Sequence, residues 1–272
     1  MYLQPSGAKS LSKKAEHKLT VMSGSDAPKQ QAVRADKFLL EQGYFDTRAQ
    51  AQAAIKAGKV RVNGRVLKKA STLLTEQDQI NAAKVHPWVS RGGIKLDYAL
   101  KTFGINVDGV TALDVGASTG GFTDVLLTRG AAKVFAVDVG HDQLHAKLKD
   151  DPRVISMEGQ DARALKLDMF TPAPSLIVCD ASFISATKVL SAALNIAHAG
   201  TRLITLVKPQ FEVGPEGIGK GGIVKSASLS DIALSDVSAW VSSKGWQIEA
   251  TDSSPIKGGS GNTEFLLYAI KL

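Results

Sequence analysis

The sequence predicts a doubly wound α/β domain at residues 92–272, preceded by a small α+β module at residues 33–81. In the larger region, apolar segments alternate with helical ones, which is typical of a parallel sheet covered by helices on both faces. The smaller region combines two helical segments with one β-hairpin signal. We expect residues 1–32, rich in Lys, Ser, Gly and Gln, to form a disordered basic arm.

The charge of the chain is divided unevenly between these regions. Residues 1–32 carry five Lys against two acidic residues, and residues 33–85 carry ten Lys and Arg against five. Residues 86–272 carry eighteen basic against nineteen acidic residues. A basic cluster can be only a solvated face, but a compact basic module joined to a neutral body favours a polyanionic partner, most simply nucleic acid.

The composition narrows the class of protein further. Hydrophobic residues make up 44% of the chain and charged residues 22%, as in an ordinary globular protein. No apolar run approaches the roughly 20 residues that span a bilayer, and the N-terminus has no secretory signal pattern. The single cysteine, Cys179, excludes an internal disulfide, and the histidines show no metal-ligand spacing. We therefore expect a cytoplasmic protein that binds no metal and no membrane.

The small module is predicted to contain two helices and a hairpin. Gly43 is suited to cap the end of the first helix, and the second runs from an Asp-Thr pair at 46–47 to Gly58. The Asn-Gly pair at 63–64 lies between alternating segments, and it is the strongest short hairpin signal because both turn positions favour positive φ.

A short linker, residues 82–91, is expected to join the two units, with Pro87 as a breaker and Trp88 as a bulky anchor. The basic side chains of the module and of the linker's end are the predicted nucleic-acid contacts. They are Arg34, Lys37, Arg48, Lys56, Lys59, Arg61, Arg65, Lys68, Lys69 and Arg91.

The larger domain begins its strand–helix alternation with the segment "ALDVGAS". The predicted strands lie, in order, within residues 112–118, 133–139, 153–162, 174–182 and 201–210. A helix at 229–245 then precedes a strand pair within 246–272, which brings an antiparallel strand into a mostly parallel sheet. Ligands of such sheets bind at the carboxyl ends of the strands.

The loop after the first of these strands predicts a cofactor site. Gly116, Gly120 and Gly121 follow the strand and precede a helix, so the backbone can approach a ligand closely. The spacing is not that of the dinucleotide fingerprint, and Asp114 stands two residues before the first glycine. A carboxylate there would repel a pyrophosphate and pair with an amino group. The loop therefore favours S-adenosylmethionine over NAD.

Three further carboxylates follow the next strands. Asp138 is placed to accept from ribose hydroxyls, Asp161 from an adenine amino group, and Asp180 ends the fourth strand. Each alone could be a loop acid or a helix cap, but the series on one rim favours a Rossmann-like class I methyltransferase. The predicted cofactor residues are Asp114, Gly116, Ser118, Gly120, Gly121, Phe122, Asp138, Val139, Asp161, Ala162 and Asp180.

Several motifs together resemble one family. "VSRGGIKLDYAL", "LDVGASTGGFTDVLL", "CDASFIS", "LVKPQFE" and "GNTEFLLY" are similar to those of the TlyA family of ribosomal-RNA 2′-O-methyltransferases, whose catalytic domain belongs to the FtsJ (RrmJ-like) group. The N-terminal module resembles the RNA-binding domain of small-subunit ribosomal protein four. The resemblance covers about residues 33–272, and His86 departs from it because a basic residue is expected there.

The resemblance implies a catalytic tetrad of Lys95, Asp180, Lys208 and Glu264. It also implies methylation of a cytidine ribose, with ribosomal RNA or ribosomal subunits as partners and no obligate protein partner. The chemistry suits these residue types, because a ribose hydroxyl is a very weak acid and its proton must be removed as it attacks the methyl group. Lys208 is the candidate base or hydroxyl-orienting group. Lys95 supplies a like charge that would lower the pKa of Lys208, and the charges of Asp180 and Glu264 oppose that effect.

Two other classes remain as alternatives. A membrane-active haemolysin is one, because the family has carried that label, although no strongly amphipathic cationic helix is predicted. A non-catalytic RNA-binding factor for ribosome assembly is the other, and the intact tetrad argues against it. An NAD dehydrogenase is disfavoured by the glycine spacing.

Overall fold

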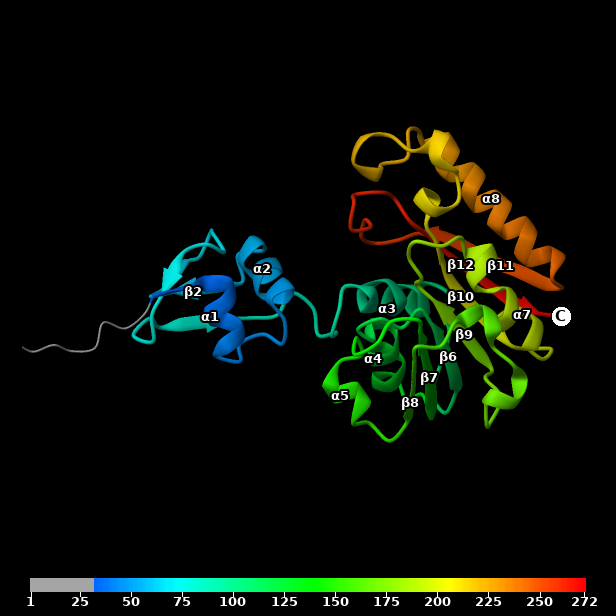
Figure 1. Ribbon diagram of the computed structural model, residues 1–272, viewed down its shortest axis with the longest axis horizontal. Helices are drawn as coiled ribbons and strands as arrows, with labels where there is room; N and C mark the ends of the chain where they lie inside the picture. Colours follow the sequence, from blue (N-terminus) through cyan, green and yellow to red (C-terminus); the bar gives the residue numbers. More distant parts are fainter. Residues whose placement is uncertain (1–31) are drawn as a thin grey trace, which may run out of the picture.

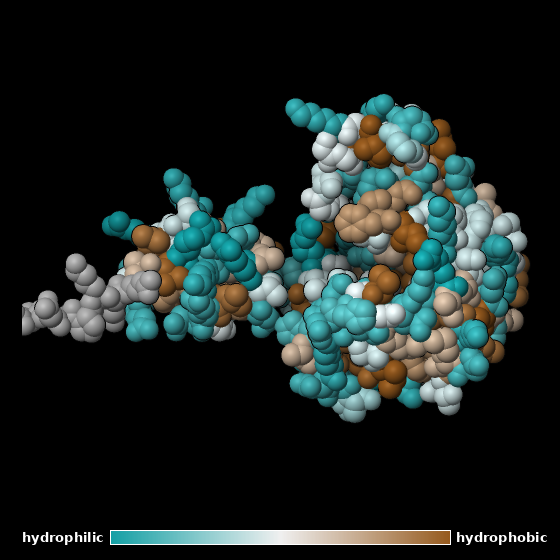
Figure 2. Space-filling model, viewed as in Figure 1, coloured by the Kyte–Doolittle hydropathy of each residue, from teal (hydrophilic) through white to brown (hydrophobic). Residues whose placement is uncertain are grey.

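The computed structural model describes residues 32–272, which form a small N-terminal domain and a larger α/β domain (Figure 1). The predicted basic arm lies outside the described residues except for its last position. The surface of the small domain is mostly hydrophilic in Figure 2, and the larger domain is hollowed on the same face. Within residues 32–272, no helix is long and apolar enough to cross a membrane.

The small domain packs two helices against short strands around its own apolar core. Its elements are β1 (Val33–Arg34), α1 (Ala35–Glu41), α2 (Arg48–Lys56), β2 (Val60–Val62), β3 (Arg65–Val66), β4 (Leu73–Leu74) and β5 (Ile80–Ala82). β2 pairs with β3 and β5, and β1 pairs with β4, all antiparallel.

Local signals in the small domain act as the sequence predicts. Asn63 and Gly64 have φ values of 50° and 80°, and this turn joins β2 to β3. Gly43, with φ 72°, follows the end of α1. Thr47 caps α2, since its side chain accepts a hydrogen bond from Gln50 N at 3.2 Å. The two-residue pairing of β1 with β4 was not predicted.

The larger domain is built on a seven-stranded sheet with the order β11-β12-β10-β9-β6-β7-β8. Its strands are β6 (Thr111–Val115), β7 (Lys133–Asp138), β8 (Val154–Glu158), β9 (Leu176–Cys179), β10 (Arg202–Val207), β11 (Trp246–Ser253) and β12 (Phe265–Lys271). β12 lies between β10 and β11 and is antiparallel to both, so the predicted antiparallel C-terminal strand is confirmed.

Helices cover both faces of this sheet, which explains why its strands read as continuous apolar runs. They are α3 (Gly92–Thr102), α4 (Gly121–Thr128), α5 (Ala146–Lys149), α6 (Ala186–Val189), α7 (Ser191–Ile196) and α8 (Ala227–Ser243). Neighbouring strand residues enter opposite cores: Ala112 packs with α3 and α4, and Leu113 with α6, α7 and α8.

Two predicted boundaries differ from the structure, and one helical segment is divided. The helical segment after β9 is interrupted at Leu190, which separates α6 from α7. α8 begins at Ala227, two residues before the predicted start, because the Ser226 side chain accepts from Leu229 N and caps the helix. Ala82, expected in the linker, is the last residue of β5 and pairs with Val60.

Candidate active site

Two adjoining cavities open at the carboxyl ends of the parallel strands. The first, here called the lysine cavity, has a volume of about 410 Å³ and is lined by Lys95 and Lys208. The second, the rim cavity, has a volume of about 600 Å³ and is lined by Asp138 and Asp161. Asp180 lines both, so one carboxylate connects the two spaces.

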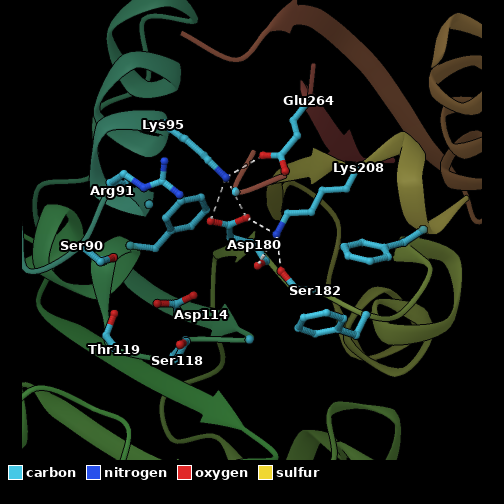
Figure 3. A pocket seen from close by; sticks show the side chains of 18 of the residues that line it. Ser90, Arg91, Lys95, Asp114, Ser118, Thr119, Asp180, Ser182, Lys208 and Glu264 are labelled. Atoms are coloured by element: carbon cyan, nitrogen blue, oxygen red, sulfur yellow. Dashed lines mark hydrogen bonds and ion pairs between the residues drawn. The ribbon is translucent and has the colours of Figure 1, made fainter. Parts of the chain in front are cut away.

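The structure brings the four predicted tetrad residues together from four elements (Figure 3). Lys95 comes from α3, Asp180 directly follows β9, Lys208 directly follows β10, and Glu264 directly precedes β12. Val207 of β10 pairs with Phe265 of β12 in an antiparallel arrangement. Lys208 follows Val207 and Glu264 precedes Phe265, so both residues lie at the same end of this strand pair.

The tetrad forms one chain of alternating charges. Lys95 Nζ lies 2.7 Å from Glu264 Oε2 and 3.4 Å from Asp180 Oδ1. Lys208 Nζ lies 2.7 Å from the same Asp180 Oδ1. Lys95, Lys208 and Glu264 are 7%, 6% and 2% exposed. Two buried lysines are thus balanced by two carboxylates, and removing any one member would leave an uncompensated charge.

Lys208 is held in place by three acceptors. Besides the ion pair with Asp180, its Nζ donates to the Asp180 backbone oxygen at 3.0 Å and to Ser182 Oγ at 2.7 Å. An ammonium group has three N–H donors, so this set is complete. The backbone at Lys208 is extended, with φ −111° and ψ 96°, as expected before Pro209.

The predicted glycine loop lies between β6 and α4, and two of its residues need to be glycine. Gly116 and Gly120 have φ values of 78° and 90°, a region that other residues rarely adopt. A Cβ on Gly120 would lie 2.2 Å from Leu148 Cδ1. Ser118 N donates to Asp138 Oδ2 at 2.8 Å, which ties the loop to the end of β7.

Asp114 is a buried carboxylate with one free oxygen. Its Oδ2 accepts from the N and Oγ1 of Thr123, at 3.0 and 2.7 Å. Its Oδ1 is buried and has no hydrogen-bond partner among residues 32–272. Burial raises the pKa of Asp114 to about 7, against the lowering effect of the Thr123 hydrogen bonds. An unpartnered acceptor that lines the lysine cavity fits the cationic amino group of S-adenosylmethionine.

Asp138 and Asp161 line the rim cavity, but both already have partners. Asp138 accepts from the backbone N–H groups of Ser118 and Gly140, each at 2.8 Å. Asp161 caps a short 3-10 helix and pairs with Arg163, whose hydrogen bond lowers the pKa of Asp161 to about 2. Asp161 therefore has the helix-capping role that the sequence left as an alternative, while the predicted contacts of both residues with the cofactor stay predictions.

The remaining predicted cofactor residues divide between the two cavities. Val139, which is 72% exposed, and Ala162 line the rim cavity and give it an apolar surface. Phe122 and Gly121 line the lysine cavity instead. The cavities thus offer carboxylates, loop amides and an apolar rim, a set suited to the amino acid, ribose and base parts of S-adenosylmethionine.

Residues missed from the sequence complete the lysine cavity. Phe211 and Gln210 line it from the 3-10 helix η3 (Pro209–Phe211), directly after Lys208. The rings of Phe183 and Phe211 lie 5.5 Å apart, and Phe183 is 92% exposed with φ 65°. The only sequence signal for Gln210 and Phe211 was their place after the lysine strand.

The predicted RNA contacts all lie at exposed positions, but not all are free. Arg34 and Arg48 pair with Asp36, a fully buried carboxylate, so they also stabilise the small domain. These guanidinium groups hold the pKa of Asp36 well below its usual range. The other predicted contacts lie around the hairpin, in the rest of the small domain, and, for Arg91, beside the lysine cavity.

Comparisons with known proteins agree with this geometry. Residues 88–271 match the FtsJ-like methyltransferase family, and residues 33–80 match the S4 domain. The chain is 40% identical to Hemolysin A of Brachyspira hyodysenteriae, over 88% of this chain and 100% of that protein. It is 41% identical to the 16S/23S rRNA (cytidine-2′-O)-methyltransferase TlyA of Mycobacterium tuberculosis, over 86% of this chain and 88% of that protein.

A solved structure described as a candidate hemolysin from Streptococcus thermophilus has a TM-score of 0.71 and 41% identity, with 89% of each chain covered. The predicted fold, methyltransferase activity and S-adenosylmethionine cofactor are confirmed by these matches. The chain belongs to the TlyA family of FtsJ-like methyltransferases and carries an N-terminal S4 domain.

Proposed function

We propose that this enzyme methylates the 2′-hydroxyl of a cytidine ribose in ribosomal RNA. The observation that carries the proposal is the buried chain of Lys95, Asp180, Lys208 and Glu264, which lies against the predicted cofactor site. The name of the relative from Mycobacterium tuberculosis supports the same substrate. The S4 domain, which is typical of RNA-binding proteins, supports RNA as the partner.

S-Adenosylmethionine, when bound, supplies an electrophilic methyl group carried on a sulfonium. Asp114 would hold its amino group, and the amides of the glycine loop would approach its carboxylate. Asp138, Val139 and Asp161 would contact the ribose and base in the rim cavity. The part of the lysine cavity next to Lys95, Lys208 and Glu264 then remains for the ribose that receives the methyl group.

In this proposal Lys208 positions the attacking hydroxyl. Its ammonium first releases one proton to solvent, and the neutral amine then takes the proton of the hydroxyl. Ser182 Oγ is the one uncharged side-chain acceptor of Lys208, so a ribose hydroxyl can replace it without removing a charge from the tetrad. Asp180 fixes the direction of Lys208, while Lys95 and Glu264 fix Asp180. A group held in this way gives the near-attack orientation on which in-line transfer depends.

The target nucleotide has to leave its stack to reach a cavity of this depth. The Phe183 and Phe211 rings supply an aromatic surface beside the lysine cavity on which its base can stack. The S4 domain would hold the neighbouring phosphates and set the register. A non-catalytic assembly factor would need none of this buried charge arrangement.

The proposal is tested by mapping 2′-O-methylation across ribosomal RNA with wild type, Lys208→Ala and Lys208→Arg. Both variants should reduce methyl transfer by at least about 10³-fold, because Lys208→Arg keeps the charge but cannot take a proton. Binding of S-adenosylmethionine should change by less than about threefold, since Lys208 does not contact it.

The matched control is Lys101→Ala, which removes an exposed lysine from the same helix as Lys95 and should leave activity intact. If Lys208→Arg kept most of the activity, the proton-accepting role would be wrong. If Lys208→Ala kept it, the tetrad would not be the catalytic site. If wild type methylated no ribosomal RNA, the substrate would be wrong.

A further inference from the structure

The Glu264 carboxylate is fixed on three sides, and only one of them belongs to the tetrad. Its Oε2 accepts from Lys95 Nζ at 2.7 Å. Its Oε1 accepts from Gln210 Nε2 at 3.2 Å. A Cβ on Gly258 would lie 2.3 Å from that same Oε1, so the backbone of Gly258 bounds the carboxylate closely. Both oxygens of the Glu264 carboxylate are therefore confined by neighbouring groups.

Gln210 is committed to this contact. Its bond to Glu264 is its one side-chain hydrogen bond within residues 32–272, and its Oε1 is buried without a partner. If the amide were turned over, Gln210 Oε1 would face Glu264 Oε1 and two acceptors would meet. The Nε2 donor of Gln210 therefore faces Glu264. An amide with an unpaired oxygen contributes little to folding, since leaving a buried acceptor unpaired is unfavourable.

The hydrogen bond from Gln210 to Glu264 is connected to Lys208 through the other residues of the tetrad. Gln210 donates to Glu264, and Lys95 lies between Glu264 and Asp180. Asp180 in turn pairs with Lys208 at 2.7 Å. Gln210 and Lys208 are also separated by a single residue, Pro209, so one turn places both ends of the network.

Gly258 is held by the backbone of Asn262, a residue whose own side chain is buried. Gly258 N donates to Asn262 O at 2.9 Å, which closes a tight turn ahead of Glu264. The Asn262 side chain donates to Gly222 O at 2.8 Å and accepts from Val224 N at 2.9 Å. These two hydrogen bonds join the turn to the glycine-rich segment before α8.

We propose that Gln210 and the Gly258 turn are positioning elements that aim the Glu264 carboxylate at Lys95. The inference rests on the proposed role of the tetrad. Neither element touches the reacting atoms, because each acts through Glu264. Their loss lets the carboxylate rotate away from Lys95, and Asp180 then has to neutralise both lysines.

The test uses Gln210→Met, which keeps the length of the side chain and removes its donor, and Gly258→Ala, which intrudes on Oε1. We expect each variant to lower kcat about tenfold or more, because each disturbs a hydrogen bond to a charged group. KM for S-adenosylmethionine and for RNA should stay within about twofold. The Tm of Gln210→Met should not fall, which separates positioning from a structural role.

A double-mutant cycle makes the route explicit. In a Glu264→Gln background, Gln210→Met should reduce kcat by less than about twofold further, because its effect passes through the carboxylate. Equal losses in both backgrounds, or no loss in the wild-type background, would overturn the inference.

Crystal structures of both variants separate this inference from the proposed function. We expect the Oε2–Nζ separation of Glu264 and Lys95 to exceed hydrogen-bonding distance in each. An unchanged separation in both overturns the inference whatever the substrate is. A changed separation in an enzyme that methylates no ribosomal RNA upholds the positioning and overturns only the substrate.

Discussion

Asp114 is a buried carboxyl group whose burial opposes folding when the group is ionised. Its carboxylate is 1% exposed, and one of its oxygens has no partner among residues 32–272. Burial raises the pKa of Asp114 to about 7. Between about pH 4 and pH 7 the folded protein therefore holds a proton on this group that the unfolded chain would release. Such groups are typical of binding sites, because a ligand of opposite charge relieves the unfavourable burial.

Binding of S-adenosylmethionine should therefore depend on pH through Asp114. In the proposed site the amino group of the cofactor pairs with the ionised carboxylate, so the proton would have to leave when the cofactor binds. We expect the Kd of wild type to rise as pH falls from 7.5 to 6, by up to about tenfold per unit below pH 7. Asp114→Asn should bind more weakly at pH 7.5 and show little change over this range, as measured by calorimetry.

The same substitution should raise stability at high pH. A carboxylate whose pKa is raised in the folded state contributes stability that is fully present below its unfolded pKa, near 4, and is lost as pH rises through about 7. At pH 8 the ionised group opposes folding, so Asp114→Asn should raise the free energy of unfolding by about 1–3 kcal/mol. A loss of stability at pH 8 would contradict the pKa assigned to Asp114.

Individual residues differ in how far the sequence predicts them. Lys95, Asp180, Lys208 and Glu264 each stand in a recognisable motif, and the structure brings all four together. Gln210 stands in no such motif. Its proposed role depends on the Glu264 carboxylate, to which its side-chain amide donates a hydrogen bond. That carboxylate is 54 positions further along the chain, and only the pairing of β10 with β12 brings the two together.

At the scale of elements, the glycine loop and α4 form a constrained part of the predicted cofactor site. Gly120 adopts φ 90° directly before the helix, and Leu148 of α5 fills the space where a Cβ would lie. Asp138 fixes the other end of the loop through Ser118. The backbone of the loop is thus fixed by packing against Leu148 and by the hydrogen bond to Asp138.

Gly120→Ala should disturb this element more than its size suggests. The new Cβ meets Leu148 Cδ1 at 2.2 Å, and the residue has to hold an unfavourable φ. We expect a loss of about 1–3 kcal/mol of stability by denaturant unfolding, together with at least about tenfold weaker binding of S-adenosylmethionine. Gly104→Ala is the matched control, since it has a similar φ of 65° but nothing within 4 Å of its Cβ.

That control should lose stability without losing cofactor affinity. If both variants weakened binding equally, the loop conformation would not be what the cofactor requires.

Elements were predictable where burial on two faces leaves an apolar run, as in β6, β7, β9 and β10. The break between α6 and α7 was not, because Leu190 is a strong helix former and no glycine or proline marks the site. The pairing of β1 with β4 involves two residues on each strand and joins positions about 40 residues apart. A pattern of two residues is too short to be seen in the sequence.

At the scale of the whole molecule, Val89 of the linker forms hydrogen bonds with both domains. Its N–H donates to Asp124 Oδ2 of α4 at 2.9 Å, and its oxygen accepts from Gln50 Nε2 of α2 at 3.0 Å. One linker residue is thus bound by both domains. Asp46 of the S4 domain also pairs with Lys84 of the linker at 2.6 Å.

The excess of basic residues and the predicted active site lie in different domains. The basic residues that are free to meet a polyanion are concentrated in the S4 domain, and the larger domain is close to neutral. We therefore expect the S4 domain to provide most of the RNA affinity and most of its salt dependence. Binding of S-adenosylmethionine should not depend on the charge of the S4 domain.

Reversing charge at Arg65 and Lys68, which are exposed at and after β3, tests this division. The double variant Arg65→Glu/Lys68→Glu should weaken RNA binding and lower the slope of log K against log salt by about 0.7–0.9 for each phosphate that it no longer neutralises. Its Kd for S-adenosylmethionine should match wild type. Lys244→Glu, at the end of α8, is the control for a change of charge elsewhere. Equal changes of slope in the two variants would show that the RNA surface extends over the whole enzyme rather than lying in the S4 domain.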